Sequence, residues 1–228
     1  MKSLRYGPVY LLQALLLLAF AHPVFADPTP PPGGMIYTFA GNGNANYGGD
    51  GGAAASASFN QPADIAVDTA GNVYIADSGN NRIRKVDAGG NTTTVAGNGI
   101  GGYGGDNGPA INARLNAPVG IAVDSAGNLY IADELNSRIR KVDASGVITT
   151  VAGNGVAGFF GDGGAATAAE INHPQDVAVD GAGNLFIADA YNNRIRKVDP
   201  SGNINTVAGS GTSFGASSKP VGSRYRRP

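Results

Sequence analysis

The chain has 228 residues, of which 42% are hydrophobic and 14% charged, so it is long enough and apolar enough to bury a sizeable core. It contains no cysteine, which excludes disulfides, thiolate nucleophiles, iron-sulfur ligation and a lipid-modified N-terminal cysteine. Its 36 glycines follow no collagen period and indicate many tight turns between short strands.

The N-terminal segment has the pattern of a signal peptide. Lys2 and Arg5 form a basic start, residues 9–21 are apolar, and residues 24–26 (Val-Phe-Ala) form a small-x-small cleavage motif. The alternative is a transmembrane anchor, but the apolar run is shorter than the ~20 residues that span a bilayer. The sequence therefore predicts a signal peptide over residues 1–26 and a secreted or periplasmic protein.

A proline-rich linker (residues 27–34, DPTPPPGG) precedes a body that is built from an internal repeat. The period is 56 residues without insertion or deletion, as the spacing of Asp77, Asp133 and Asp189 shows. We therefore place one repeat region over residues 35–211, with repeats at about 62–97, 118–153 and 174–209.

Each repeat is predicted to form four short strands, which in the first repeat are residues 64–67, 73–76, 82–86 and 92–96. Turn residues separate them, notably in the Asp-Thr-Ala-Gly-Asn segment that begins at Asp68. The pattern is an antiparallel meander. Its apolar residues alternate weakly, as expected if neighbouring repeats cover both faces of each sheet.

The motif P-x-x-[IV]-A-V-D-x-A-G-N-[VL]-[YF]-I-A-D-x-x-N-x-R-I-R-K-V-D, which occurs three times, resembles the NHL repeat of β-propellers. The linking G-N-G-x-x-x-[YF]-x-G-D-x-G-x-A segment is similar to the long inter-blade insert of exported bacterial members of that family. The resemblance implies an all-β fold of β-propeller blades around a central channel, often six of them, with ligands bound by the blade loops.

Three repeats predict three four-stranded antiparallel blades, which form an open arc or partial propeller because closure needs ~4–8 blades. Residues 36–39 match the outer strand that ends each repeat, yet residues 203–207 already supply that strand to the last repeat. A homodimer completing a six-bladed propeller is the simplest closure. The alternative is a truncated piece of a longer propeller, followed by a disordered basic tail over residues 212–228.

The D-x-x-N-x-R pattern at the second turn of each repeat has two interpretations. We favour a structural clamp in which the carboxylate contacts the arginine fork, since all three copies are identical. The alternative is a ring of polar groups that binds a ligand at the channel mouth. The residues concerned are Asp77, Arg82, Asp133, Arg138, Asp189 and Arg194.

The Gly-rich insert carries one aspartate per copy: Asp50, Asp106 and Asp162. We expect Asp50 to cap a short helical turn over residues 53–59. A Ca²⁺ site is a weak alternative because such sites gather several oxygen ligands. His173 is the one histidine outside the predicted leader, so we expect no metal site and no cofactor.

A specific site is expected where the repeats differ, because residues shared by all blades serve the blade itself. The candidate ligand-binding residues are Glu134, Tyr191, Ser78, Tyr47, Tyr103 and Phe159. They predict a binding or scaffold module for a protein, peptide or glycan. The alternative is a propeller enzyme of the lyase or lactonase-like hydrolase type with a channel-bound metal, which the missing histidine cluster disfavours.

Nucleic acid is not an expected partner. Residues 27–211 hold 10 basic and 17 acidic residues, a net charge of −7, whereas nucleic-acid-binding surfaces are basic.

Overall fold

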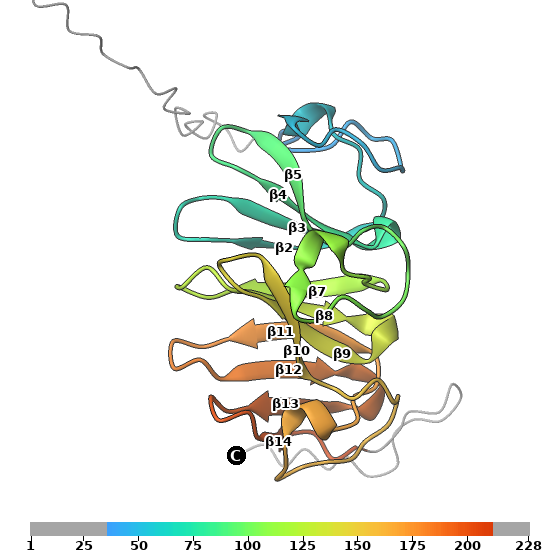
Figure 1. Ribbon diagram of the computed structural model, residues 1–228, viewed down its shortest axis with the longest axis vertical. Coiled ribbons are helices and arrows are strands. Elements are labelled where there is room, and N and C mark those ends of the chain that lie inside the picture. Colours follow the sequence, from blue (N-terminus) through green and yellow to red (C-terminus); the bar gives the residue numbers. More distant parts are fainter. Residues whose placement is uncertain (1–35, 212–228) are drawn as a thin grey trace, which may run out of the picture. The chain divides into compact units, whose positions relative to one another are not determined.

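The computed structural model describes residues 36–211 and shows an all-β protein of three antiparallel sheets that follow one another along the chain (Figure 1). The predicted signal peptide, linker and basic tail lie outside the described residues. Within residues 36–211, no helix has both the length and the apolar character needed to cross a membrane.

Each sheet is formed by one repeat. The first contains β1 (Gly52–Ala53), β2 (Pro62–Val67), β3 (Val73–Asp77), β4 (Arg82–Val86) and β5 (Asn91–Ala96). The second contains β6 (Gly108–Pro109), β7 (Pro118–Val123), β8 (Leu129–Asp133), β9 (Arg138–Val142) and β10 (Val147–Ala152). The third contains β11 (Pro174–Val179), β12 (Leu185–Asp189), β13 (Arg194–Val198) and β14 (Ile204–Ala208).

The predicted four-stranded meander is confirmed, with strand orders β5-β4-β3-β2, β10-β9-β8-β7 and β11-β12-β13-β14. The prediction of four strands per blade is wrong for two sheets. Short insert strands β1 and β6 add a fifth, outermost strand beside β5 and β10. The third sheet has one isolated bridge, between Ala165 and Asn203, at the equivalent place. Gly-Ala and Gly-Pro pairs carry no hydrophobic alternation, so no sequence pattern indicated these strands.

Short 3-10 helices complete each repeat. In the inserts they are η1 (Ala54–Ser56), η3 (Ala110–Asn112) and η5 (Ala166–Ala168); at the turn between the second and third strands of the meander they are η2 (Ser78–Asn80), η4 (Glu134–Asn136) and η6 (Ala190–Asn192). The predicted helical turn after Asp50 is therefore present but shorter than expected.

The first turn of each blade has the predicted Asp-centred structure. Asp68 Oδ1 accepts hydrogen bonds from the backbone N–H groups of Ala70 and Asn72, and Gly71 adopts a φ of +81°. Partial burial opposes ionisation of Asp68, but the hydrogen bonds from Asn72 and Ala70 prevail and lower its pKa.

The hydrophobic core lies between sheets rather than within them. Tyr74, Ala76, Ile83 and Ala96 of the first sheet form one buried cluster with residues of the second, including Leu115 and Ile131. A second cluster joins the second and third sheets in the same way. Val86, on the opposite face from Ile83, is also buried. Packing on both faces explains the weak alternation along the strands, and the sheets do not close into a ring within residues 36–211 (Figure 1).

Candidate functional site

In every blade, the loop before the first strand of the meander is tied to the turn between the second and third strands. The Asn60 N–H donates to Asp77 Oδ1 at 2.7 Å, and the Gly79 N–H donates to the Asn60 carbonyl at 2.8 Å. The second and third repeats make the same two bonds, around Asp133 and Asp189. The residues that differ between repeats in these two segments therefore lie together at one end of the strands of each sheet.

The carboxylate at this turn contacts a different arginine from the one expected. Asp77 is fully buried and accepts hydrogen bonds from Asn80 Nδ2 at 2.9 Å and from Arg84 at 3.4 Å, although it stands opposite Arg82 in the strand register. Asp133–Arg140 and Asp189–Arg196 repeat this pair. The clamp thus uses the second arginine of Arg-Ile-Arg.

That second arginine also fixes the insert to the sheet, so the predicted role of Asp50 as a helix cap is wrong. Arg84 is fully buried and forms an ion pair with Asp50 at 2.6 Å, and Arg196 pairs with Asp162 at 2.8 Å. Arg140 contacts Asp106 in the same way. The 3-10 helix η1 begins after Ala53 without a side-chain cap.

Opposite pKa shifts mark the two carboxylates that share Arg140. Burial opposes ionisation of Asp106, but hydrogen bonds from Thr150 and Tyr103 and the charge of Arg140 outweigh it and lower the pKa, as equivalent contacts do for Asp50 in the first blade. Burial dominates at Asp133 and raises its pKa to about 6, despite hydrogen bonds from Asn136, Asn116 and Arg140. The lowered pKa thus favours the ionised form of the insert aspartate, whereas the raised pKa of Asp133 favours its protonated form.

The three insert aromatic residues predicted to contact ligand are engaged within the protein. Arg82 lies over the Tyr47 ring at 3.7 Å from its centroid and donates to the carbonyls of Asn80 and Asn98. The Tyr47 hydroxyl donates to Asp50. Tyr103 and Phe159 take the same place under Arg138 and Arg194, at 3.7 and 3.4 Å. These three rings hold the insert against the blade.

Two other predicted residues do come together, at the junction between the second and third sheets. Glu134 begins η4 of the second sheet, whereas Tyr191 lies in η6 of the third. His173, in the loop before β11, joins them: its Nδ1 is 3.3 Å from Glu134 Oε1, and its ring centroid is 4.4 Å from that of Tyr191. Glu134, His173 and Tyr191 are hereafter the inter-blade triad.

The triad occurs at one of the two junctions between described sheets. At the equivalent places between the first and second sheets stand Ser78, Ala117 and Leu135. Ser78, also a predicted site residue, starts η2 of the first sheet and so lies one blade away. Sequence reasoning missed His173 as a partner, although its departure from Gln61 and Ala117 at the same repeat position was the signal.

The triad offers a carboxylate acceptor, an imidazole and an exposed phenol ring. The Tyr191 side chain is 60% exposed, and the side chains of His173 and Glu134 are 30% and 17% exposed. Such groups bind hydroxyl, amide or amine groups through hydrogen bonds and a flat apolar surface through the ring. Within residues 36–211, no cluster of three or more His, Cys, Asp or Glu is arranged to hold a metal ion.

Comparison with protein families matches most of the repeat region. The family described as NHL repeat matches residues 59–86, and the family described as teneurin NHL domain matches residues 101–157 and 155–225. These matches cover more than half of the chain.

Individual relatives are similar to the chain over part of their length. Protein SUPPRESSOR OF QUENCHING 1, chloroplastic, from Arabidopsis thaliana is 32% identical over 176 residues, which are 73% of this chain and 16% of that protein. NHL repeat-containing protein 2 from Bos taurus is 31% identical over 178 residues, which are 73% of this chain and 24% of that protein. The chain thus spans a quarter or less of these relatives.

Among solved structures, a protein of unknown function from Bacteroides thetaiotaomicron is similar with a TM-score of 0.49 and 31% identity. The match covers 56% of this chain and 32% of that one.

Proposed function

Since the chain belongs to the NHL-repeat family of β-propellers, we propose that it is an exported binding or scaffold module that recognises a protein, peptide or glycan at the inter-blade triad. The observation that carries the proposal is the convergence of Glu134, His173 and Tyr191 from two blades. All three positions differ between otherwise near-identical repeats, and ligand recognition commonly resides in variable loops on a rigid scaffold.

The repeats themselves supply conservative test variants. Glu134→Ser, His173→Gln and Tyr191→Leu each introduce the residue that another blade already carries at the same position. These changes should leave the fold intact, because the same local backbone accepts the new residues elsewhere. Gln61, Ala117 and His173 even share a φ near +50°.

The experiment is to screen the purified protein on peptide and glycan arrays and to measure the affinity of each hit for the variants. We expect each triad variant to weaken binding by at least ~10-fold, the loss of one good hydrogen bond or ring contact. Ser78→Ala is the matched control in the first blade and should bind normally. Equal affinity of all three triad variants and the parent protein would contradict the proposal.

A second candidate function is hydrolysis or elimination, which the hydrogen bond between His173 and Glu134 favours. A carboxylate at Nδ1 orients the imidazole as a general base, which needs no metal. In this case His173→Gln would abolish turnover while ligand affinity changed little. Elemental analysis of the purified protein tests the metal-dependent version of this alternative, and we expect no stoichiometric zinc.

Export and self-association complete the proposal. The leader pattern favours cleavage after Ala26, so N-terminal sequencing of the exported protein should begin at Asp27. A retained leader in a membrane fraction would favour an anchored protein instead. We also propose that two copies of the chain associate.

A further inference from the structure

Each sheet presents one row of four residues to the sheet that follows it. In the first sheet the row is Tyr74, Ala76, Ile83 and Ala96, and in the second it is Tyr130, Ala132, Ile139 and Ala152. The equivalent row of the third sheet is Phe186, Ala188, Ile195 and Ala208, hereafter the leading face. Ile83 and Ile139 are 0% exposed, whereas Ile195 is 38% exposed. The leading face therefore has the composition of a buried interface but no sheet packed against it within residues 36–211.

The first sheet carries the residues that, in the second and third sheets, pack against the preceding sheet. Its insert and first strand carry Ala54, Ala57, Phe59 and Ile65, hereafter the trailing face. The equivalent residues of the second sheet, including Leu115 and Ile121, are buried under the first sheet. Ile65 is 64% exposed, but its equivalents Ile121 and Val177 are 4% and 3% exposed.

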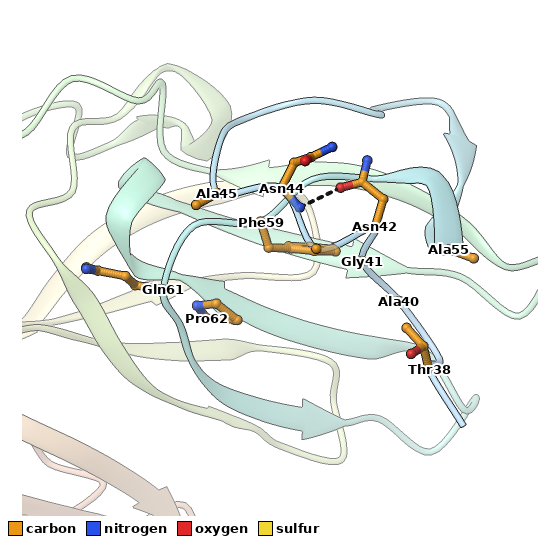
Figure 2. Close-up of a pocket in the computed structure, with 11 residues that line it drawn as sticks. Thr38, Ala40, Gly41, Asn42, Asn44, Ala45, Ala55, Phe59, Gln61 and Pro62 are labelled. Atoms are coloured by element: carbon orange, nitrogen blue, oxygen red, sulfur yellow. Dashed lines mark hydrogen bonds between the residues drawn. The ribbon is translucent and has the colours of Figure 1, made fainter. Parts of the chain in front are cut away.

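Open pockets lie at both faces. A pocket of about 770 Å³ beside Phe59 of the trailing face is also lined by Gln61, Pro62, Thr38 and residues 40–45 (Figure 2). A second pocket, of about 350 Å³, is lined at the leading face by Ala188, Arg194, Ile195 and Ala208. Between the first and second sheets, by comparison, Leu115 and Ile83 are packed at 0% exposure.

We propose that the leading face of one copy of this chain packs on the trailing face of a second copy, head to tail, in the contact that the chain already makes twice internally. The proposal specifies the self-association included in the proposed function and does not depend on the ligand site. The residues on the two sides are the same types as at the internal junctions, with two exceptions. Phe186 stands on the leading face where the other sheets have Tyr, and Phe59 stands on the trailing face where the other inserts have Leu or Ile. A second copy is thus a partner of matching shape and apolarity.

The energetic argument follows from the sizes of the clusters. The two internal junctions each bury a large hydrophobic cluster shared by two sheets. On the side of the first sheet that carries the trailing face, the buried cluster is smaller: Ala54, Ile75 and Val86, with Ala40, Phe59 and Val73 packed against it. Extended apolar surface is unusual on soluble monomers, and its burial is the main driving force for association. Two such junctions related by a two-fold axis close a dimer, so neither face remains open.

Docking requires one local rearrangement. Ala40 packs against the trailing-face cluster at the repeat position equivalent to Ala208. Residues 36–40 form no strand and Ile36 is 98% exposed, so they can be displaced readily. Gly41 and Asn42 must move as well, because their N–H groups donate to the carbonyls of Ala54 and Ala57 just as Gly97 and Asn98 donate at the internal junction. Gly209 and Ser210 of the other copy are the equivalent residues that would replace them. Ala208 of the other copy then takes the place of Ala40.

Light scattering on the full chain tests the proposal with one variant on each face. Ile195→Glu and Ile65→Glu alter exposed side chains, so circular dichroism should show an unchanged fold. We expect a parent mass of two chains at micromolar concentration and at least ~10-fold weaker association for each variant, since a buried unpaired carboxylate is costly. Val156→Glu changes an insert residue whose exposure, 53%, lies between those of Ile195 and Ile65, and this variant should remain dimeric.

Mixing the two variants identifies the head-to-tail arrangement. The Ile65→Glu copy keeps an intact leading face and the Ile195→Glu copy an intact trailing face, so the mixture should regain one junction and form heterodimers. A folded monomeric parent, or a dimer that resists both substitutions, would overturn the proposal. So would a mixture without heterodimers. Array binding by the monomeric variants reports separately on the triad.

Discussion

At the scale of single residues, the buried arginine of each blade is the most consequential side chain. Arg84 neutralises Asp77 inside the sheet and Asp50 in the insert, and it also donates to the carbonyls of Gly48 and Ser58. Arginine suits this position because its planar fork reaches several acceptors at once. One side chain therefore holds a glycine-rich segment that has little hydrophobic surface of its own.

Replacement of this arginine should destabilise the protein strongly. Arg84→Met leaves Asp77 buried without its cation, and removal of one partner of such a pair costs about 3–5 kcal/mol. Arg82→Met, two residues earlier and partly exposed, should cost about 1–2 kcal/mol from the lost ring contact and hydrogen bonds. Urea denaturation measures both. Equal losses for the two variants would show that Arg84 has no special role.

The raised pKa of Asp133 predicts a pH dependence of stability. The native carboxyl binds its proton up to about pH 6, against an ordinary pKa of 3.8, so the folded state holds more protons between these values. The free energy of unfolding should therefore fall as the pH rises from about 4 to about 6, by on the order of 2–3 kcal/mol for this group. Asp189, with a pKa raised by burial, acts in the same direction.

Chemical denaturation at several pH values tests this effect with two matched variants. Asp133→Asn should flatten the fall between pH 4 and 6. Asp124→Asn should leave it unchanged, because hydrogen bonds from Asn128 overcome the effect of burial and lower the pKa of Asp124. Stability supplied by Asp124 is instead lost as the pH drops below about 4. A parent protein whose stability rises between pH 4 and 6 would contradict the assignment.

At the scale of elements, the junction between one blade and the next insert depends on a close backbone approach. Gly97 follows β5 with a φ of +86°, and a Cβ there would lie 2.2 Å from the Asn81 carbonyl oxygen. Gly153 and Gly209 repeat this geometry. The glycine thus permits the last strand to pass directly over the turn that ends η2.

Two alanine substitutions distinguish the destabilisation caused by steric overlap from the destabilisation caused by a positive φ. Gly71 has a similar φ of +81°, but a Cβ added there would meet no atom within 4 Å, so Gly71→Ala should cost only the ~1–2 kcal/mol of left-handed strain. Gly97→Ala adds a steric overlap and should cost at least about 2 kcal/mol more, since the neighbouring backbone must shift. Thermal denaturation of both variants measures the difference. Similar losses of stability in the two variants would mean that the backbone near Gly97 shifts to remove the steric overlap at little cost.

At the scale of the whole molecule, the blades depend on one another because the core lies between them. Ile139, on the second sheet, is packed in the cluster shared with the third and is 0% exposed. A blade in isolation would leave this face in water. The described sheets should therefore unfold as one cooperative unit rather than one by one.

Ile139→Ala tests this cooperativity. The substitution should lower stability by about 2–5 kcal/mol and shift a single transition, with fluorescence and circular dichroism midpoints that coincide. Ile111→Ala, at a side chain 54% exposed, should change stability by no more than about 0.5 kcal/mol. Two separate transitions in the Ile139 variant would show that the blades are independent.

The repeat, the four meander strands of each blade and the Asp-centred turns were determined by the sequence alone. Local signals carry them: apolar segments of four to six residues, Asp-x-x-Gly-Asn turns and a strict 56-residue period. The resemblance of the motif then identified the propeller blade. These features are encoded within a few neighbouring residues, so they need no knowledge of distant contacts.

The tertiary structure alone decided which polar residues meet. Asp50 and Arg84 are 34 residues apart, and Glu134 and His173 are 39 residues apart, so no local spacing brings either pair together. The choice of Arg84 over Arg82 depends on how the insert folds back over the sheet. The triad likewise exists because packing of the second sheet on the third brings two loops within contact distance.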